Sequence, residues 1–304
     1  MRFRPLYAAA FAALAFSSAV PTVRGHGIVG NRFFPPTVST DDPFAADELA
    51  FPTLSYVKNA AGDGSPASHE IDAGFEFDKL ILPKLSLGVS DTYVAVRPDQ
   101  GPSSHGWTDL TLNLKYQVWQ NDEHEAVVAV GASAEIGGTG SKHADANSFT
   151  TFEPTFYFGK GFGDLPESLA VLQPFAVTGV VGQTFPTRSA DPNVLEWGFA
   201  LEYSLPYLQQ HVQDVGLPAP FKDMIPLVEF AMQTAENRDQ GGLTTGTINP
   251  GVLWESPYLQ VGVEANIPIN NHSGTHVGVT VQAWIYIDDL FPRVFGHPIF
   301  GENP

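Results

Sequence analysis

The sequence predicts an all-β fold, a transmembrane antiparallel up-and-down β-barrel of about 12 strands with a short irregular N-terminal segment. Three observations lead to this prediction. Five segments alternate cleanly between apolar and polar residues, short connections alternate with long ones, and no uncharged apolar run after residue 25 is long enough for a transmembrane helix. Because backbone groups in lipid must be paired within the protein, a chain that crosses the membrane without such helices must form a closed barrel.

The first 25 residues have the composition of a secretory signal peptide. Arginines occupy positions 2 and 4, an uncharged alanine-rich stretch covers 6–20, and Val23 and Gly25 precede the expected cleavage point. The apolar stretch is shorter than a comfortable membrane span. We therefore expect residues 1–25 to be removed during export.

The clean alternation occurs in five segments, each of which predicts a strand with one apolar and one polar face. In 107–119 the even positions from 110 to 118 are Leu, Leu, Leu, Tyr and Val, whereas the odd positions from 109 to 117 are Asp, Thr, Asn, Lys and Gln. The other four are 71–78, 195–204, 259–267 and 277–286. Weaker alternation covers 49–58, 85–96, 125–137, 149–160, 169–185, 225–235 and 245–255. Most of these segments are near the ~9–11 residues of a tilted membrane strand.

The connections differ in length between the two ends of the predicted barrel. The mostly short ones are 83–84, 120–124, 159–167 and 256–257. The longer ones, rich in Gly, Ser, Asn and Asp, are 59–68, 97–106, 138–148, 186–193, 236–242 and 270–274. Short periplasmic turns and longer external loops are typical of outer-membrane barrels. The connection 205–224 is long on the periplasmic side, and we expect it to hold a short amphipathic helical turn.

A secreted β-sandwich is the alternative fold, since its strands also have one apolar face. Three features favour the barrel: the chain has no cysteine, one face of many strands is nearly free of charge, and aromatic residues gather near strand ends, as in interfacial girdles. These residues are Trp107, Trp119, Phe149, Phe152, Tyr203, Trp254 and Tyr258. Pro154, Pro174 and Pro250 interrupt predicted strands, and we expect bulges or rim positions there.

Composition and motifs exclude several functions. The net charge is -18, from 15 Lys+Arg against 33 Asp+Glu, and there is no basic run, so we expect no nucleic-acid partner. The absence of cysteine excludes disulfides, iron–sulfur clusters and cysteine nucleophiles. The chain contains no nucleophile elbow, zinc-protease pair, phosphate-binding loop or dinucleotide fingerprint. We expect neither an enzyme nor a cofactor.

Several motifs resemble one known family. They are HGIVGNRFFPP at 26–36, TDDPF at 40–44, DLTLNLKY at 109–116 and TINPG at 247–251. Together they resemble a proteobacterial outer-membrane family labelled for the meta-pathway of phenol degradation and often described as transporter-like. The resemblance covers most of the chain after residue 25. It implies a barrel with a transport role and no established chemistry.

The polar strand faces predict an acidic lumen. If the apolar faces meet lipid, the acids on the opposite faces line the lumen, and Lys115 is the clearest base among them. These acids are Asp72, Glu76, Asp109, Glu153, Glu196, Glu202, Glu229 and Glu264. Rings of acids favour cations and repel anions. The alternative is a filled lumen in which these groups form a satisfied polar core.

Loop histidines suggest a second kind of site. His272 and His276 share one predicted external loop, and His143 stands near Asp145 in another, so these side chains could capture zinc or copper. His26, at the mature N-terminus, could chelate a metal through its ring and amine. Solvated loop histidines without metal are the alternative.

These observations predict a channel or transporter-like barrel at 47–288 in the outer membrane of a Gram-negative bacterium. We expect small neutral, aromatic or cationic solutes as cargo, and outer-membrane lipid and the barrel-assembly machinery as partners. The segment 26–46 is expected to plug the lumen, to lie at its periplasmic mouth, or to be a flexible tether, and 289–304 forms a tail. The alternative functions are a non-conducting surface or assembly barrel, a metal-capturing barrel, and a hydrolase that uses Ser104 and His105.

Overall fold

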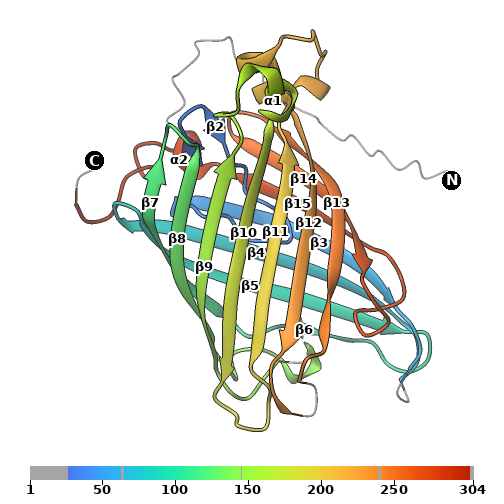
Figure 1. Cartoon of the computed structure of the whole chain (residues 1–304). Coiled ribbons are helices and arrows are strands. Elements are labelled where there is room, and N and C mark those ends of the chain that lie inside the picture. Colours follow the sequence, from blue (N-terminus) through green and yellow to red (C-terminus); the bar gives the residue numbers. More distant parts are fainter. Residues whose placement is uncertain (1–26, 63–64, 145, 239–240, 302–304) are drawn as a thin grey trace, which may run out of the picture.

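Twelve antiparallel strands form one closed barrel in the computed structural model, which describes residues 27–62, 65–144, 146–238 and 241–301. The barrel closes because β3 (Glu48–Asn59) pairs with both β4 (Ser68–Leu82) and the last strand, β15 (Gly278–Ile285). The other barrel strands are β5 (Leu85–Pro98), β7 (Thr111–Asn121), β8 (Ala126–Glu135), β9 (Thr151–Gly161), β10 (Phe175–Pro186), β11 (Val194–Tyr203), β12 (Met224–Ala235), β13 (Thr244–Glu255) and β14 (Leu259–Pro268) (Figure 1). The predicted fold class and strand number are confirmed, and the sandwich is excluded.

The two ends of the barrel carry different connections. We call the end at which the chain enters β3 and leaves β15 the termini end, and the opposite end the loop end. At the termini end, residues 204–223 contain the helical turns α1 (Leu205–Tyr207), η3 (Leu208–Val212) and η4 (Phe221–Asp223), which confirms the expected helical structure there. No helix in the described part of the chain is long and apolar enough to cross a membrane.

The predicted strand 107–119 is divided into two pieces. The short strand β6 (Ser104–Trp107) pairs with the loop-end half of β5, and β7 pairs with its other half. Residues 108–110 between them are not part of a strand, and there the Asp109 carboxylate accepts N–H bonds from the connection 136–150. A second difference lies at 169–172, which was predicted as strand and belongs instead to the 3₁₀ helix η2 (Glu167–Leu172).

Two of the three prolines interrupt a strand pairing. Pro154 lies inside β9 opposite Ala132, and the pairing of β9 with β10 passes from Thr155 directly to Phe152. Pro174 precedes β10. At Pro250 the ladder between β13 and β14 is interrupted, since the pairing continues from Ile248 directly to Gly251. A proline has no N–H to donate, so this gap follows from the missing donor.

The barrel is apolar outside and polar inside. Leu112, Leu114, Tyr116 and Val118 of β7 face outward and are 42–51% exposed. The inward-facing Glu202, Glu229 and Glu264 are 0–2% exposed. Water-soluble proteins show the reverse distribution, with acids almost never buried. The arrangement is that of a barrel whose outer surface meets lipid.

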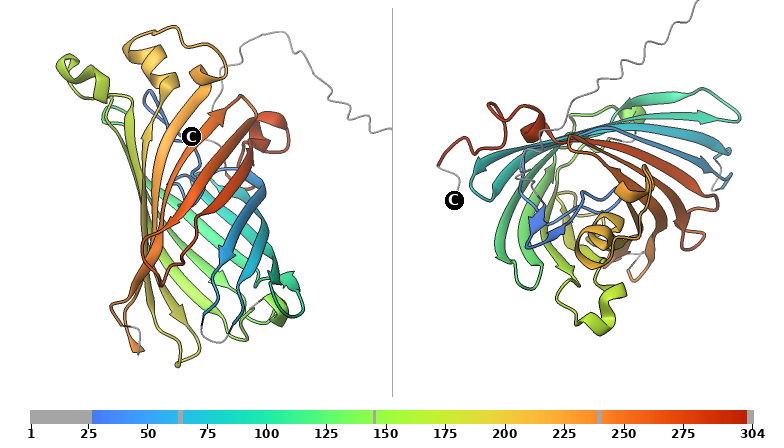
Figure 2. Two further views of the ribbon diagram at one scale, coloured as in Figure 1. Left: turned by 90° about the vertical axis from the view of Figure 1, so that its right-hand side faces the viewer. Right: turned by 90° about the horizontal axis from the view of Figure 1, so that it is seen from above.

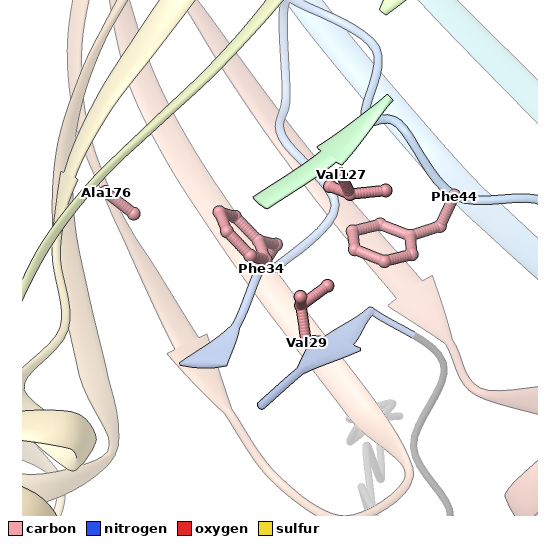
Figure 3. Packing of buried hydrophobic residues seen from close by; sticks show 5 residues of the cluster. All are labelled: Val29, Phe34, Phe44, Val127 and Ala176. Atoms are coloured by element: carbon pink, nitrogen blue, oxygen red, sulfur yellow. The ribbon is translucent and has the colours of Figure 1, made fainter. Parts of the chain in front are cut away.

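Residues 27–46 lie inside the barrel at the termini end, and we call them the N-terminal insert. A small hairpin of β1 (Ile28–Val29) and β2 (Arg32–Phe33) begins it, and the right-hand view of Figure 2 shows it in blue within the ring of strands. Val29, Phe34 and Phe44 pack against Val127 of β8 and Ala176 of β10 in a buried cluster (Figure 3). The hydrophobic core of this protein therefore includes contacts between the insert and the barrel wall.

The C-terminal tail lies outside the barrel wall at the termini end (Figure 2, red). It begins with α2 (Ile287–Leu290). The Asp47 carboxylate accepts hydrogen bonds from Lys79 Nζ at 2.8 Å and from the Gly296 N–H at 2.6 Å. The Phe300 N–H donates to the Ile81 carbonyl at 2.9 Å, so the tail pairs with the part of β4 that extends beyond β3.

Candidate functional site

The lumen encloses a cavity of about 640 Å³ between the insert and the loop end of the barrel. Glu153, Thr155 and Tyr157 of β9 line one side, and Ser39–Asp41 of the insert also line this cavity. Inward-facing residues of a strand alternate with lipid-facing ones, and this spacing places Glu153, Thr155 and Tyr157 together in the lumen. The insert therefore divides this space from the termini end.

One carboxylate binds the turn formed by residues 37–42 of the insert. Glu229 of β12 accepts backbone N–H bonds from Val38 at 2.7 Å, Ser39 at 3.0 Å and Thr40 at 2.6 Å. It also accepts the Thr40 hydroxyl at 2.8 Å, and the Ser39 hydroxyl donates to Glu264 of β14 at 2.8 Å. Hydrogen bonds to an ionised group are about twice as strong as neutral ones. Glu229 is thus the main attachment of this turn.

Lys115 of β7 binds the same turn from another part of the wall. Its Nζ lies 2.7 Å from Asp41 Oδ1 and 2.9 Å from the Asp42 carbonyl oxygen. Five strand pairings separate β7 from β12 in the barrel order, so the two attachments come from nearly opposite walls. The turn therefore bridges the lumen.

Two glycines of the wall allow the insert to approach it closely. A Cβ at Gly198 would lie 2.8 Å from Thr40 Cγ2, and one at Gly262 would lie 2.6 Å from Val38 Cγ2. Both distances are shorter than a normal carbon contact. Any larger residue at either position would displace the insert or the strand.

A buried ionic network fixes the base of the insert. The Arg32 guanidinium is 1% exposed and donates to Glu125 Oε2 at 3.2 Å and to the Pro174 carbonyl at 2.9 Å. It lies 3.7 Å from the ring centroid of Tyr207, whose hydroxyl donates to Glu125 Oε1 at 2.9 Å. Burial and this hydrogen bond raise the pKa of Tyr207 to about 12, so its hydroxyl keeps its proton and remains a donor. The network ties the insert to three connections at the termini end.

The predicted lumen acids divide into distinct groups. Glu153 and Glu196 line the cavity of about 640 Å³, whereas Glu76 lines a second cavity of about 170 Å³ beside the insert. Asp72 accepts the Ser55 hydroxyl at 2.8 Å, and Glu202 accepts the Thr178 hydroxyl at 3.3 Å. Together with Glu229 and Glu264, these residues all face the inside of the barrel.

Asp109 lines neither of the two lumen cavities, although its alternation predicted a lumen-lining residue. Its carboxylate accepts backbone N–H bonds from Thr139 at 3.1 Å, Gly140 at 2.9 Å and Asn147 at 2.5 Å. Asp109 is 3% exposed and holds the connection 136–150 at the loop end. Three N–H bonds to one carboxylate stabilise it strongly, and Asp109 makes them at the point where the strand is broken.

The predicted metal ligands are not brought together. His272 lines the larger cavity, His276 contacts the Thr275 hydroxyl at 3.0 Å, and His143 lies in η1 (Lys142–Ala144). In the described part of the chain, no group of three or more histidine, aspartate and glutamate side chains could hold a metal ion. His26 and Asp145 lie outside the described residues.

Ser104 and His105 do not form a catalytic pair. They are consecutive in β6, so their side chains point to opposite faces of the sheet. His105 points outward, where its Nδ1 lies 2.8 Å from the Tyr93 hydroxyl.

The site residues predicted from the sequence do not include Arg32, Asp41, Glu125 and Tyr207. Arg32 and Asp41 belong to the family-like motifs at 26–36 and 40–44, which was the one available signal. Glu125 and Tyr207 lie in connections with no regular pattern, so only the folded structure shows their role.

The closed barrel, with its apolar outer face and polar interior, is that of the porin-like outer-membrane barrels. Among solved structures, the chain is similar to an outer membrane channel from Pseudomonas putida F1, with a TM-score of 0.54 and 11% identity over 83% of this chain and 99% of that chain. It also resembles the KdgM porin, with a TM-score of 0.43 and 11% identity over 78% of this chain and 98% of that chain. For the NanC porin the TM-score is 0.46 and the identity 9%, over 78% of this chain and 98% of that chain. At these identities the similarity concerns the fold. No protein-family model and no curated protein sequence matches the chain.

Proposed function

We propose that this protein is a gated outer-membrane channel that passes small neutral, aromatic or cationic solutes through an acidic lumen. In this proposal the turn 37–42 of the insert is the gate. The observation that carries it is the position of this turn, which crosses the lumen between Glu229 and Lys115 and separates the larger cavity from the termini end.

The insert has two parts with different attachments, and this difference supports gating. Its base is held by the apolar cluster of Val29, Phe34 and Phe44 and by the buried Arg32 network. In the turn 37–42, Val38 packs against the buried cluster of Ile225, Leu227 and Leu253. The other contacts of the turn are hydrogen bonds and one ion pair, which can exchange for bonds to water or solute. Residues 39–42 can therefore move while the base stays in place.

The groups lining the cavity support the choice of solutes. Glu153 and Glu196 are acids on its wall, and Lys115 is already paired with Asp41. An acidic wall of this kind attracts cations and repels anions. Tyr157 adds an aromatic ring beside Glu153 on the wall of this cavity.

We place the loop end of the barrel outside the cell and both termini in the periplasm. The lengths of the connections favour this orientation, because outer-membrane barrels have short periplasmic turns and longer external loops. The barrel would reach a Gram-negative outer membrane after cleavage of residues 1–25, which lie outside the described residues, and the barrel-assembly machinery would insert it.

Conductance of the refolded protein in a planar bilayer, under a salt gradient, tests the proposal. We expect discrete, cation-selective steps that open and close. A barrel that inserts but never conducts, either in the wild type or after removal of residues 27–46, would contradict the proposal and favour a non-conducting surface barrel.

A further inference from the structure

A third cavity lies on the outer surface of the barrel, away from the lumen. Its volume is about 740 Å³, and it lies at the loop end of β3, β4, β5 and β6. Its strand residues include Tyr56, Ile71 and Tyr93, which share the outward-facing side with Leu54 and Trp107. This volume is within the roughly 300–1,000 Å³ of small-molecule sites. We call it the outer groove.

Two tyrosine–histidine pairs form the walls of the outer groove. Tyr56 stacks on His69 with ring centroids 6.0 Å apart, and its hydroxyl lies 2.7 Å from His69 Nδ1. Tyr93 and His105 repeat this arrangement, with ring centroids 6.0 Å apart and an oxygen–Nδ1 distance of 2.8 Å. The hydrogen bonds fix the rings on both sides of the groove. Small or aliphatic residues, Ile71 and Ala95, lie between the pairs and form an apolar floor.

The rim of the outer groove carries an available positive charge. The Arg97 side chain is exposed, and its guanidinium makes no hydrogen bond or ion pair with the described residues. The one acid of the groove, Asp99, lies 3.7 Å from His69 Nε2. A neutral histidine whose Nδ1 accepts a hydrogen bond from a tyrosine hydroxyl carries its hydrogen on Nε2. His105 in this form can donate a hydrogen bond from Nε2 at the rim. These donors favour an anion in a protein whose net charge is -18.

The position of the groove along the barrel axis indicates what kind of molecule it meets. His69 is paired with Arg97 near the loop ends of β4 and β5, and the apolar floor lies below them toward the middle of the strands. Tyrosines at this level are typical of the membrane–water interface. A ligand with an anionic head at Arg97 and an apolar chain over Ile71 and Ala95 therefore matches the groove.

We propose that the outer groove binds one phosphorylated glycolipid of the outer leaflet, with a head-group phosphate at Arg97 and an acyl chain between Tyr56 and Tyr93. Arginine suits this role because its planar guanidinium binds phosphate oxygens bidentately. The choice of glycolipid over phospholipid rests on the proposed orientation, with the loop end outside. The site does not depend on conduction through the lumen.

Native mass spectrometry of the full-length mature protein in detergent, with added lipid A or phosphatidylglycerol, tests this site. The wild type is expected to retain one lipid A molecule. Arg97→Gln removes the charge, and Ala95→Trp fills the floor; each is expected to reduce retention about tenfold, the effect of losing ~1.4 kcal/mol of binding free energy. Both positions are on the surface, and heat-modifiable migration on gels verifies that each variant folds.

Matched controls separate the groove from general effects. Arg188→Gln changes another exposed arginine at the loop end, and Ala132→Trp places a tryptophan on the outer face of β8. Both controls should retain lipid A as the wild type does. Equal retention in Arg97→Gln and the wild type would overturn the proposal. So would retention of phosphatidylglycerol equal to that of lipid A, which would identify a general phospholipid site and argue against the orientation while leaving the channel function untouched.

Discussion

Lys115 and Glu229 hold consecutive residues of one turn from nearly opposite walls of the barrel. Lys115 Nζ lies 2.7 Å from Asp41 Oδ1, and Glu229 accepts the Thr40 N–H at 2.6 Å. The position of the turn 37–42, the proposed gate, depends on these two contacts, so they provide the first tests.

Replacement of Glu229 by glutamine should release the turn. The amide nitrogen of glutamine cannot accept hydrogen bonds, so at least one of the donors on Val38, Ser39 and Thr40 loses its partner. A hydrogen bond to a charged group contributes about 1.5–3 kcal/mol, so amide hydrogen exchange at 38–40 should accelerate by roughly 10- to 100-fold. Glu202→Gln, whose carboxylate accepts the Thr178 hydroxyl, is the control and should leave this exchange unchanged. Equal exchange in both variants would show that Glu229 does not hold the turn.

An engineered disulfide between the turn and the wall should hold the proposed gate closed. The test is clean because the chain has no cysteine of its own. A Cβ at Gly262 would lie 2.6 Å from Val38 Cγ2, and its other near neighbour is the end of the Leu253 side chain, so cysteines at 38 and 262 place a sulfur of one near the Cβ of the other. We expect the oxidised Val38→Cys/Gly262→Cys protein to lose about 90% of wild-type solute flux into proteoliposomes, because its open probability falls roughly tenfold. The flux should recover when reductant is added.

Each single-cysteine variant is the control for that experiment and should not respond to reductant. Undiminished flux through a fully oxidised double variant would mean that solutes pass without movement of the turn.

The two cavity acids should set ion selectivity. Glu153→Gln/Glu196→Gln replaces two acidic side chains on the wall of the lumen cavity of about 640 Å³ with neutral amides, so the reversal potential under a salt gradient should shift toward zero. Asp191→Asn is the control, because Asp191 is paired with Arg188 in the exposed connection at the loop end. If the double variant keeps the wild-type reversal potential, ions are selected elsewhere.

Tyr207→Phe should weaken the base of the insert. It removes the hydroxyl that donates to the buried Glu125, which should lower the free energy of unfolding by about 1–3 kcal/mol in urea titrations. The pKa of Tyr207 is raised to about 12 in the folded protein, so the contribution is complete below the ordinary pKa near 10 and disappears as pH rises toward 12. The stability difference from the wild type should therefore be constant from about pH 6 to 9 and shrink at higher pH. Tyr258→Phe, at an exposed tyrosine, should have no effect.

The sequence predicts the barrel wall well, because each strand position faces either lipid or the interior and the alternation records which. Leu112 and Leu114 could be placed on the outer face from their spacing alone. Asp109 could not be placed, because its partners at 139, 140 and 147 belong to an irregular loop.

The roles of the lumen acids depend on contacts distant in sequence. Glu229 and Glu153 occupy equivalent alternating positions, yet one binds the insert and the other lines the cavity. The partners of Glu229 lie about 190 residues away, and no local pattern encodes that distance. The insert itself has few strand signals, so its location inside the barrel required the structure.

The pairing of β3 with β15 has a consequence for folding. Tyr56 is paired with Val279, 279 − 56 = 223 residues later, whereas the other ladders join strands adjacent or nearly adjacent in the chain. Contacts between such remote segments form slowly, because a long loop must close before they contribute. The bonds from Ser39 to Glu264 and from Gln260 to Pro36 span similar separations, 225 and 224 residues. The seam of the barrel and the seating of its insert are therefore expected to form together as the final, least local step of assembly, so a chain truncated before β14 would lose both at once.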